Sequence, residues 1–218
     1  MSKMVWDQTG ERLYETGIEQ VALFKQKNGT YEKGVPWNGI TALNLTPSGA
    51  EPTALYANDN KYLTLMSAEE LGGTIEAFTY PDEWAECDGS VALAEGVYIG
   101  QQTRAPFGLV GKTLIGNDTE GTKHGYKLHI VYGGIASPTE QSHSTVNETP
   151  EAATLSWEFS TTPVPVKDHS PTSYICIDST KVDAEKLAEL EAKLYGGDEE
   201  EPTLLLPDEI AALMAATV

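Results

Sequence analysis

Apolar and polar residues alternate along several stretches of the chain, most regularly at 153–161. One side of that stretch carries Ala153, Leu155, Trp157 and Phe159, and the other carries Thr154, Ser156, Glu158 and Ser160. A period of two residues places successive side chains on opposite faces of a β-strand. The same period at 123–133 collects Tyr126, Leu128, Ile130 and Tyr132 on one face. These patterns predict a protein built mainly of β-strands.

Two tight turns divide the N-terminal third of the chain into hairpins. Asn28-Gly29 follows a predicted strand at 18–25, and Asn58-Asp59-Asn60 separates predicted strands at 54–57 and 61–66. Asn and Gly tolerate the positive φ angles that such turns require. Counted along the whole chain, eight to ten short strands are expected. This number, with so little helix between strands, predicts an antiparallel β-sandwich or barrel rather than a βαβ sheet.

Several segments read as connections. The region 28–53 is predicted to be a long loop and hairpin region, because Gly34–Gly39 is loop-like and the strand at 40–46 is expected to end at Pro47. Trp37 is expected to anchor that loop, and long loops of this kind are often functional or bound by partners. The stretch 67–73 is ambiguous, since a helix-capping pattern is followed by Gly72-Gly73. Polar or proline-rich loops are expected at 137–150 and 163–171.

The stretch from Thr74 to Gly89 changes its period partway. Residues 74–80 alternate as in a strand, but Pro81 lacks an amide hydrogen and suits the first turn of a helix. Asp82 and Glu83 then favour the positive end of a short helix that carries Trp84. Asp88-Gly89 closes it with a turn. We expect this segment to be the pivot between the N-terminal and C-terminal sets of strands, with Trp84 buried.

One long helix is predicted at 184–195. Asp183 is its expected N-cap, and Gly196-Gly197 ends it. Leu187, Leu190 and Leu194 form a single narrow apolar stripe, so the helix is expected to flank the outside of a sheet. Residues 198–218 form an acidic linker and an apolar C-terminal tail. The tail either starts a short helix near Pro207 or packs against a neighbouring copy.

Composition limits the possible functions. The 218 residues are 40% hydrophobic, which fits one folded domain spanning 1–218, and the net charge is −19. So acidic a chain is not expected to bind phosphate backbones or anionic membranes, which attract Lys and Arg. No apolar signal segment or membrane span is visible. Cys87 and Cys176 are expected to be reduced thiols, with Cys176 in the core.

The sequence contains no recognisable catalytic or cofactor motif. Gly108-x-x-Gly111-Lys112-Thr113 lacks the first glycine of a phosphate loop, and no zinc or nucleophile motif occurs. Solvated or hydrogen-bonded roles are expected for all four histidines: His124, His129, His143 and His169. Surface charge, rather than a calcium site, is expected for Asp82, Glu83, Glu86 and Asp88, which lack calcium-loop spacing. We therefore predict no enzyme activity, and no catalytic, cofactor-binding or metal-binding residues.

Four segments together resemble the major tail protein family of long, non-contractile-tailed bacteriophages, often carried as prophages of Gram-positive bacteria. These segments are Glu76–Gly89 (EAFTYPDEWAECDG), Ile115–His129 (IGNDTEGTKHGYKLH), Ser156–Pro163 (SWEFSTTP) and Ile177–Val182 (IDSTKV). The resemblance covers most of the chain in the right order. It implies a structural virion protein with a tail-tube fold, no catalytic residues and no cofactor.

The resemblance also implies partners and a location. Copies would form hexameric rings that stack into a tail tube around the tape-measure protein, between the tail terminator and distal tail proteins. DNA would later pass through the lumen without specific binding. The protein would be found in the virion tail, and in the host cytoplasm during assembly, with no membrane contact. The two hairpins and the 28–53 region are the candidate contacts between subunits and rings.

Three alternatives remain open. The first is the tube of a phage-tail-like bacteriocin or of a secretion machine, which the sequence does not separate from a phage tube. The second is a β-sandwich module that binds carbohydrate or a receptor, which would expose aromatic residues in a cleft. The third, a hydrolase, is the least supported, because no nucleophile or acid–base pair has a supporting context.

Overall fold

The computed structural model describes residues 3–143, 145, 152–197 and 200–215. Within these, the strands are β1 (Tyr14–Lys27), β2 (Thr30–Tyr31), β3 (Val35–Pro36), β4 (Ile40–Gly49), β5 (Pro52–Ala57), β6 (Asn60–Met66), β7 (Glu69–Ala77), β8 (Val91–Ala94), β9 (Val97–Ile99), β10 (Phe107–Asn117), β11 (Gly121–Ala136), β12 (Leu155–Thr161), β13 (Val164–Val166), β14 (His169–Thr172) and β15 (Tyr174–Asp178). The helices are α1 (Trp84–Asp88), α2 (Ala184–Tyr195) and α3 (Pro207–Ala215). The predicted fold class is confirmed: the protein is mainly β, its strand pairs are antiparallel, and a helix flanks the sheet.

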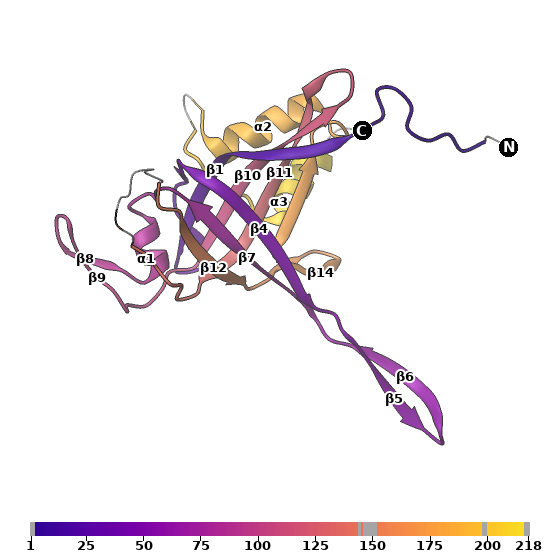
Figure 1. The fold of residues 1–218 in the computed structure, drawn as a ribbon, viewed down its shortest axis with the longest axis horizontal. Helices are drawn as coiled ribbons and strands as arrows, with labels where there is room; N and C mark the ends of the chain where they lie inside the picture. The colour runs from indigo at the N-terminus through magenta and orange to yellow at the C-terminus, as the bar shows by residue number, and fades with distance from the viewer. Residues whose placement is uncertain (1–2, 144, 146–151, 198–199, 216–218) are drawn as a thin grey trace.

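One nine-stranded sheet forms the body of the protein (Figure 1). Its strands run in the order β2-β1-β10-β11-β12-β7-β4, with β3 beside β1 and β15 beside β11. The sheet folds over so that β4, β7 and β12 pack against β1, β10 and β11. This arrangement resembles a sandwich made from a single sheet.

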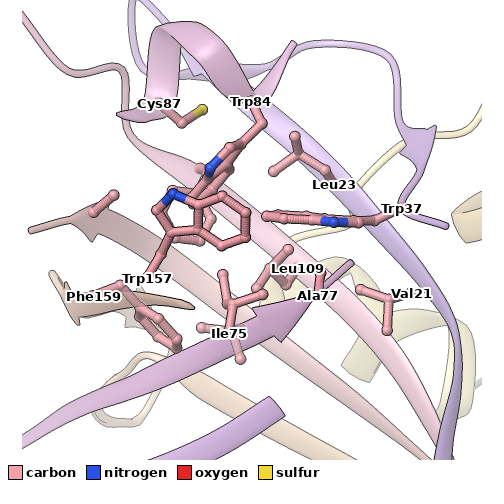
Figure 2. Close-up of a cluster of buried hydrophobic side chains, with 13 residues drawn as sticks. Val21, Leu23, Trp37, Ile75, Ala77, Trp84, Cys87, Leu109, Trp157 and Phe159 are labelled. Carbon is pink, nitrogen blue, oxygen red and sulfur yellow. The ribbon is translucent and has the colours of Figure 1, made fainter. Parts of the chain in front are cut away.

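Aromatic side chains fill the space between these two layers (Figure 2). Trp84 lies at the centre, with ring centroids 4.6 Å from Trp37, 4.9 Å from Phe107 and 5.6 Å from Trp157. Edge-to-face pairs at such distances add stabilisation beyond simple burial. The burial expected for Trp84 and the anchoring expected for Trp37 are both confirmed, and Trp37 Nε1 also donates a hydrogen bond to the Thr79 carbonyl oxygen.

The predicted passage from a strand into a short helix is confirmed, but the strand ends three residues before Tyr80, and strands from the two halves of the chain alternate in the sheet instead of forming two sets. β7 ends at Ala77, and α1 carries Trp84 and Cys87 into the core. Gly89 ends α1 with a φ of +81°, a conformation that glycine adopts without a Cβ penalty. Lys25 of β1 forms ion pairs of 3.1 Å with Glu32 and with Glu86 of α1, so α1 is also tied to the sheet from outside.

The opposite face of β1, β10, β11 and β15 is covered by α2 and α3. α2 has the predicted bounds, the Asp183 side chain accepts hydrogen bonds from the amides of Glu185 and Lys186, and the predicted leucine stripe is buried. The C-terminal tail forms α3 and buries Ile210 in this same cluster. Of the two roles expected for the tail, the helix at Pro207 is observed, and it packs against its own chain.

The 28–53 region contains the strand predicted at 40–46, as part of β4, and the short strand β2 at the end of the first hairpin. Within the predicted loop at 34–39, Val35 and Pro36 form the short strand β3. β4 continues through Pro47, which pairs with Leu71, because β4 lies at the end of the sheet and an edge strand tolerates a missing amide hydrogen. The ambiguous stretch 67–73 enters β7. There a Cβ on Gly73 would lie 2.7 Å from the Phe159 ring, so close packing explains the glycine.

Other differences concern length and exposure. β1, β10 and β11 are longer than the short strands expected, and the proline-rich stretch 163–171 contains the hairpin β13–β14. The predicted loop at 137–150 lies partly outside the described residues. Cys176 is exposed, not buried, because Ile175 and Ile177 turn toward the helices and the alternation of β15 directs Cys176 to the other face.

Candidate functional site

The residues considered for chemistry are scattered over the fold. His124 contacts the Glu120 carboxylate at 2.7 Å, His129 is half-buried between β10 and β15, and His143 and His169 are exposed. In the acidic segment around α1, Asp82 and Glu83 are exposed, Glu86 pairs with Lys25, and burial raises the pKa of Asp88. Among the described residues, no group of three or more His, Cys, Asp or Glu side chains is placed to hold a metal ion.

Both hairpins predicted from their turns are present. Asn28 and Gly29 have φ angles of 52° and 83°, and Asn58 and Asp59 have φ angles of 51° and 61°. The second hairpin, β5–β6, continues the β4–β7 pair outward and projects far from the body (Figure 1). We call residues 50–68, which contain this hairpin, the arm. The arm is the most prominent surface feature of the molecule.

Large apolar side chains are exposed on both faces of the arm. Leu55 lies opposite Leu63, and Leu65 lies on the same face of the hairpin. Tyr56 and Tyr62 are each more than 70% exposed, and Met66 is 69% exposed. An isolated two-stranded hairpin is marginally stable in water, and clustered exposed apolar side chains mark contact surfaces. The arm therefore carries a cluster of large apolar side chains that the described part of its own chain leaves exposed.

Two further segments share this character. The β8–β9 hairpin exposes Val91, Leu93, Val97 and Tyr98, and the N-terminal segment exposes Met4, Val5 and Trp6. The β8–β9 hairpin also projects from the body, beside α1 (Figure 1). None of these side chains belongs to either buried cluster. The exposed apolar surface is thus concentrated on projecting segments rather than spread over the sheet.

The outer face of the β4–β7–β12 layer has a different chemistry. Cross-strand pairing places Asn44, Thr74 and Glu158 in one row, and Ala42, Glu76 and Ser156 in the next. Both flanking helices, α2 and α3, cover the other layer of the sheet, so within the described part of the chain no helix covers this face. It combines small polar side chains with carboxylates, and its rows contain no Lys or Arg. Such a face repels polyanions.

A polar network crosses four strands on the inner side of the other layer. His129 Nδ1 lies 2.6 Å from the Tyr174 hydroxyl, and His129 Nε2 lies 2.7 Å from the Thr113 hydroxyl. Thr113 donates a hydrogen bond to Glu15, which also accepts one from Lys127. Burial lowers the pKa of His129, while the hydrogen bonds from Lys127 and Thr113 lower the pKa of Glu15. Sequence spacing could not predict this network, because its members come from four separate strands.

The lowered pKa of His129 predicts that the folded state is destabilised by acid. The unfolded chain takes up the proton nearer the ordinary pKa of about 6.5, so it binds more protons below that pH and stability falls. We expect a lower Tm at pH 5 than at pH 7.5. In His129→Gln, which cannot titrate, this difference should shrink. An unchanged pH dependence of Tm in the variant would show that other groups cause the effect.

The chain was compared with protein-family models and with curated proteins. No protein-family model matches the chain, and no curated protein matches it. Within the described residues, every helix is too short or too polar to cross a membrane.

Proposed function

We propose that this chain is a structural subunit that assembles with copies of itself into stacked rings, forming the tube of a phage tail. The observation that carries the proposal is the arm. It extends from a well-packed body and exposes apolar side chains on both faces, as expected of a segment that is buried only when copies associate. The sequence resemblance to major tail proteins supplies the kind of assembly, namely hexameric rings around a tape-measure protein.

The edge of the sheet supports self-association. Among the described residues, β4 pairs only with β7, and the ten residues of β4, from Ile40 to Gly49, carry no charge. Charged residues on an edge strand normally prevent pairing with other chains, so an uncharged edge favours it. A contact between two different surfaces of the same chain closes into a ring when its rotation permits. β4 and the arm are two such surfaces.

The open face of the β4–β7–β12 layer supports the role proposed for the channel. If this face lines the lumen, Glu76 and Glu158 repel the DNA phosphates and the small polar side chains offer nothing for DNA to bind. DNA would then pass without specific contacts. The tape-measure, tail terminator and distal tail proteins are the other partners proposed, and the virion tail is the proposed location.

Assembly is expected to depend on salt. Each subunit carries a net charge of −19, so stacked copies repel one another, and dissolved salt screens this repulsion. We predict that the concentration at which subunits associate is lower in 0.5 M NaCl than in 0.05 M NaCl, measured by static light scattering. Equal or stronger association at low salt would contradict this electrostatic account.

Two other functions are compatible with some of these surface features. A tube of a bacteriocin-like particle or secretion machine would use the same surfaces, and neighbouring capsid and packaging genes would distinguish a phage. A carbohydrate-binding module is favoured by one observation: a cleft of about 380 Å³ between β9 and α1 is lined by Tyr80 and Tyr98, each about half exposed. If the protein stays monomeric and binds sugars in this cleft, the carbohydrate-binding function is favoured over the tube.

A further inference from the structure

The N-terminal segment that precedes the first bulge of β1 contributes no side chain to either buried cluster of the body. We call residues 3–16 the strap. Its large apolar side chains are exposed, including Trp6 at 73%, and none of its residues belongs to either buried cluster. Figure 1 shows the N-terminal end of the strap running away from the body. The strap therefore presents an apolar end that its own chain does not cover.

Polar contacts fix the middle of the strap at the far end of β10. The Gly10 amide donates a 2.9 Å hydrogen bond to Asp118, and the Asn117 side-chain amide donates one of 3.3 Å to the Gly10 carbonyl oxygen. Arg12 also lies 3.7 Å from the Asp118 carboxylate. Residues 14–16 then pair with β10. Gly10 is thus held beside the β10–β11 turn.

A groove lies beside residues 18–22 of β1, which follow the strap. It has a volume of about 590 Å³, which is within the usual range of ligand pockets, about 300–1,000 Å³. Its walls come from β1, from β3 and the segment that follows it, and from the end of α2. Most of its lining is apolar, including Ile18, Val21, Val35, Trp37 and Ile40. Glu19 is the one charged side chain among the lining residues.

The backbone of the strap does not reach the groove of its own chain while Gly10 stays anchored. Ile18, at the near side of the groove, packs over Gly111 of β10. Seven positions separate Gly111 from Asp118, which is about 23 Å along a strand. Trp6 is four residues from Gly10, so its backbone reaches at most about 14 Å. The backbone at the apolar end of the strap therefore stops short of its own groove, and a second copy can bring the two surfaces together.

We infer that Met4–Trp6 of one copy insert into the groove of a second copy. Insertion buries apolar side chains that each chain leaves exposed, and it brings Lys3 of the strap toward Glu19 at the groove. The contact joins two different surfaces of the same chain, so one copy can receive a strap from a second copy while it gives its own strap to a third. This inference deepens the proposed function and rests on it in one respect: copies of the chain must associate.

Photo-crosslinking between labelled copies tests the inference. Trp6 is replaced by p-benzoylphenylalanine in the full chain, and ¹⁵N-labelled and unlabelled protein are mixed under assembly conditions and irradiated. Trypsin then yields the strap peptide 4–12, and the groove residues fall on the peptides 13–25, 34–61 and 194–218. We expect crosslinks between the labelled strap peptide of one copy and the unlabelled groove residues 18–22 or 34–40 of another, and the reverse, and fragmentation of the peptide 34–61 separates residues 34–40 from the arm. The same photoreactive residue at Leu13, which lies on the anchored part of the strap and on peptide 13–25, should give no crosslink between copies to residues 34–40.

The outcomes separate the inference from the proposed function. Ile40→Glu, which places a charge in the groove, should lower the yield of mixed crosslinks at least fivefold while circular dichroism still reports folded protein. Crosslinks confined to a single copy, or crosslinks to residues outside the groove, the arm included, would overturn the inference and leave the tube proposal standing if assembly is seen. Failure of the wild-type chain to associate under any condition would overturn both.

Discussion

Replacing Trp84 by alanine is expected to lower the free energy of unfolding by about 3–5 kcal/mol, the usual cost of deleting a large aromatic side chain from a core. Trp84 is fully buried and contacts Trp37, Phe107 and Trp157, which come from three different parts of the chain. Its removal leaves a cavity where the two layers of the sheet meet α1. Urea denaturation of the protein at low concentration, where copies do not associate, measures the effect.

Two control variants show whether the loss of stability in Trp84→Ala comes from the aromatic cluster. Trp84→Phe should cost less than Trp84→Ala, because the ring contacts are partly kept and the indole Nε1, which is buried without a hydrogen-bond partner, is removed. Trp6→Ala, at an exposed tryptophan, should change the free energy of unfolding by no more than about 0.5 kcal/mol. A loss below about 1 kcal/mol in Trp84→Ala would mean that the aromatic cluster does not hold the layers together.

Replacing three leucines of the arm by serine is expected to abolish assembly without unfolding the body. Leu55, Leu63 and Leu65 share one face of the arm. Burying each would contribute about 1.5–3 kcal/mol, and about 1.4 kcal/mol corresponds to a tenfold change in association. The concentration needed for assembly should therefore rise at least about a hundredfold. Sedimentation velocity measures it, and Tm should stay unchanged, because the arm adds nothing to the buried clusters.

A matched control lies on the same arm. Thr53→Ser and Thr64→Ser change the hairpin without removing large apolar side chains, so assembly should be preserved. Normal assembly of the triple leucine variant would show that the arm is not an assembly surface. A large fall in its Tm would instead show that the arm stabilises the monomer.

The sequence predicted the features that depend on neighbouring residues. The α2 cap at Asp183 and the turn at Asn58–Asn60 each need only a few consecutive side chains, and the structure contains both. The passage from strand to α1 likewise follows from Pro81 and the acidic residues after it. Local signals of this kind do not depend on which strands later become neighbours.

Features that depend on topology could not be predicted. Pro47 was expected to end its strand, but β4 is an edge strand and continues. Cys176 was expected in the core, but which face of β15 meets the helices is decided by its pairing with β11. The strap lacks any periodic pattern, and its anchor at Asp118 lies 108 positions away from Gly10. The arm was predicted as a hairpin, yet its projection from the body follows from the pairing of β4 with β7.

The central claim is that this chain builds a tube from copies of itself. Negative-stain electron microscopy of the purified, concentrated full-length protein in 0.5 M NaCl tests it most directly. The account predicts rings with a central hole, six subunits in each, and short stacks of such rings. The leucine-to-serine variant of the arm should give neither. A field of uniform single particles without rings, at every concentration and salt tested, would contradict the account.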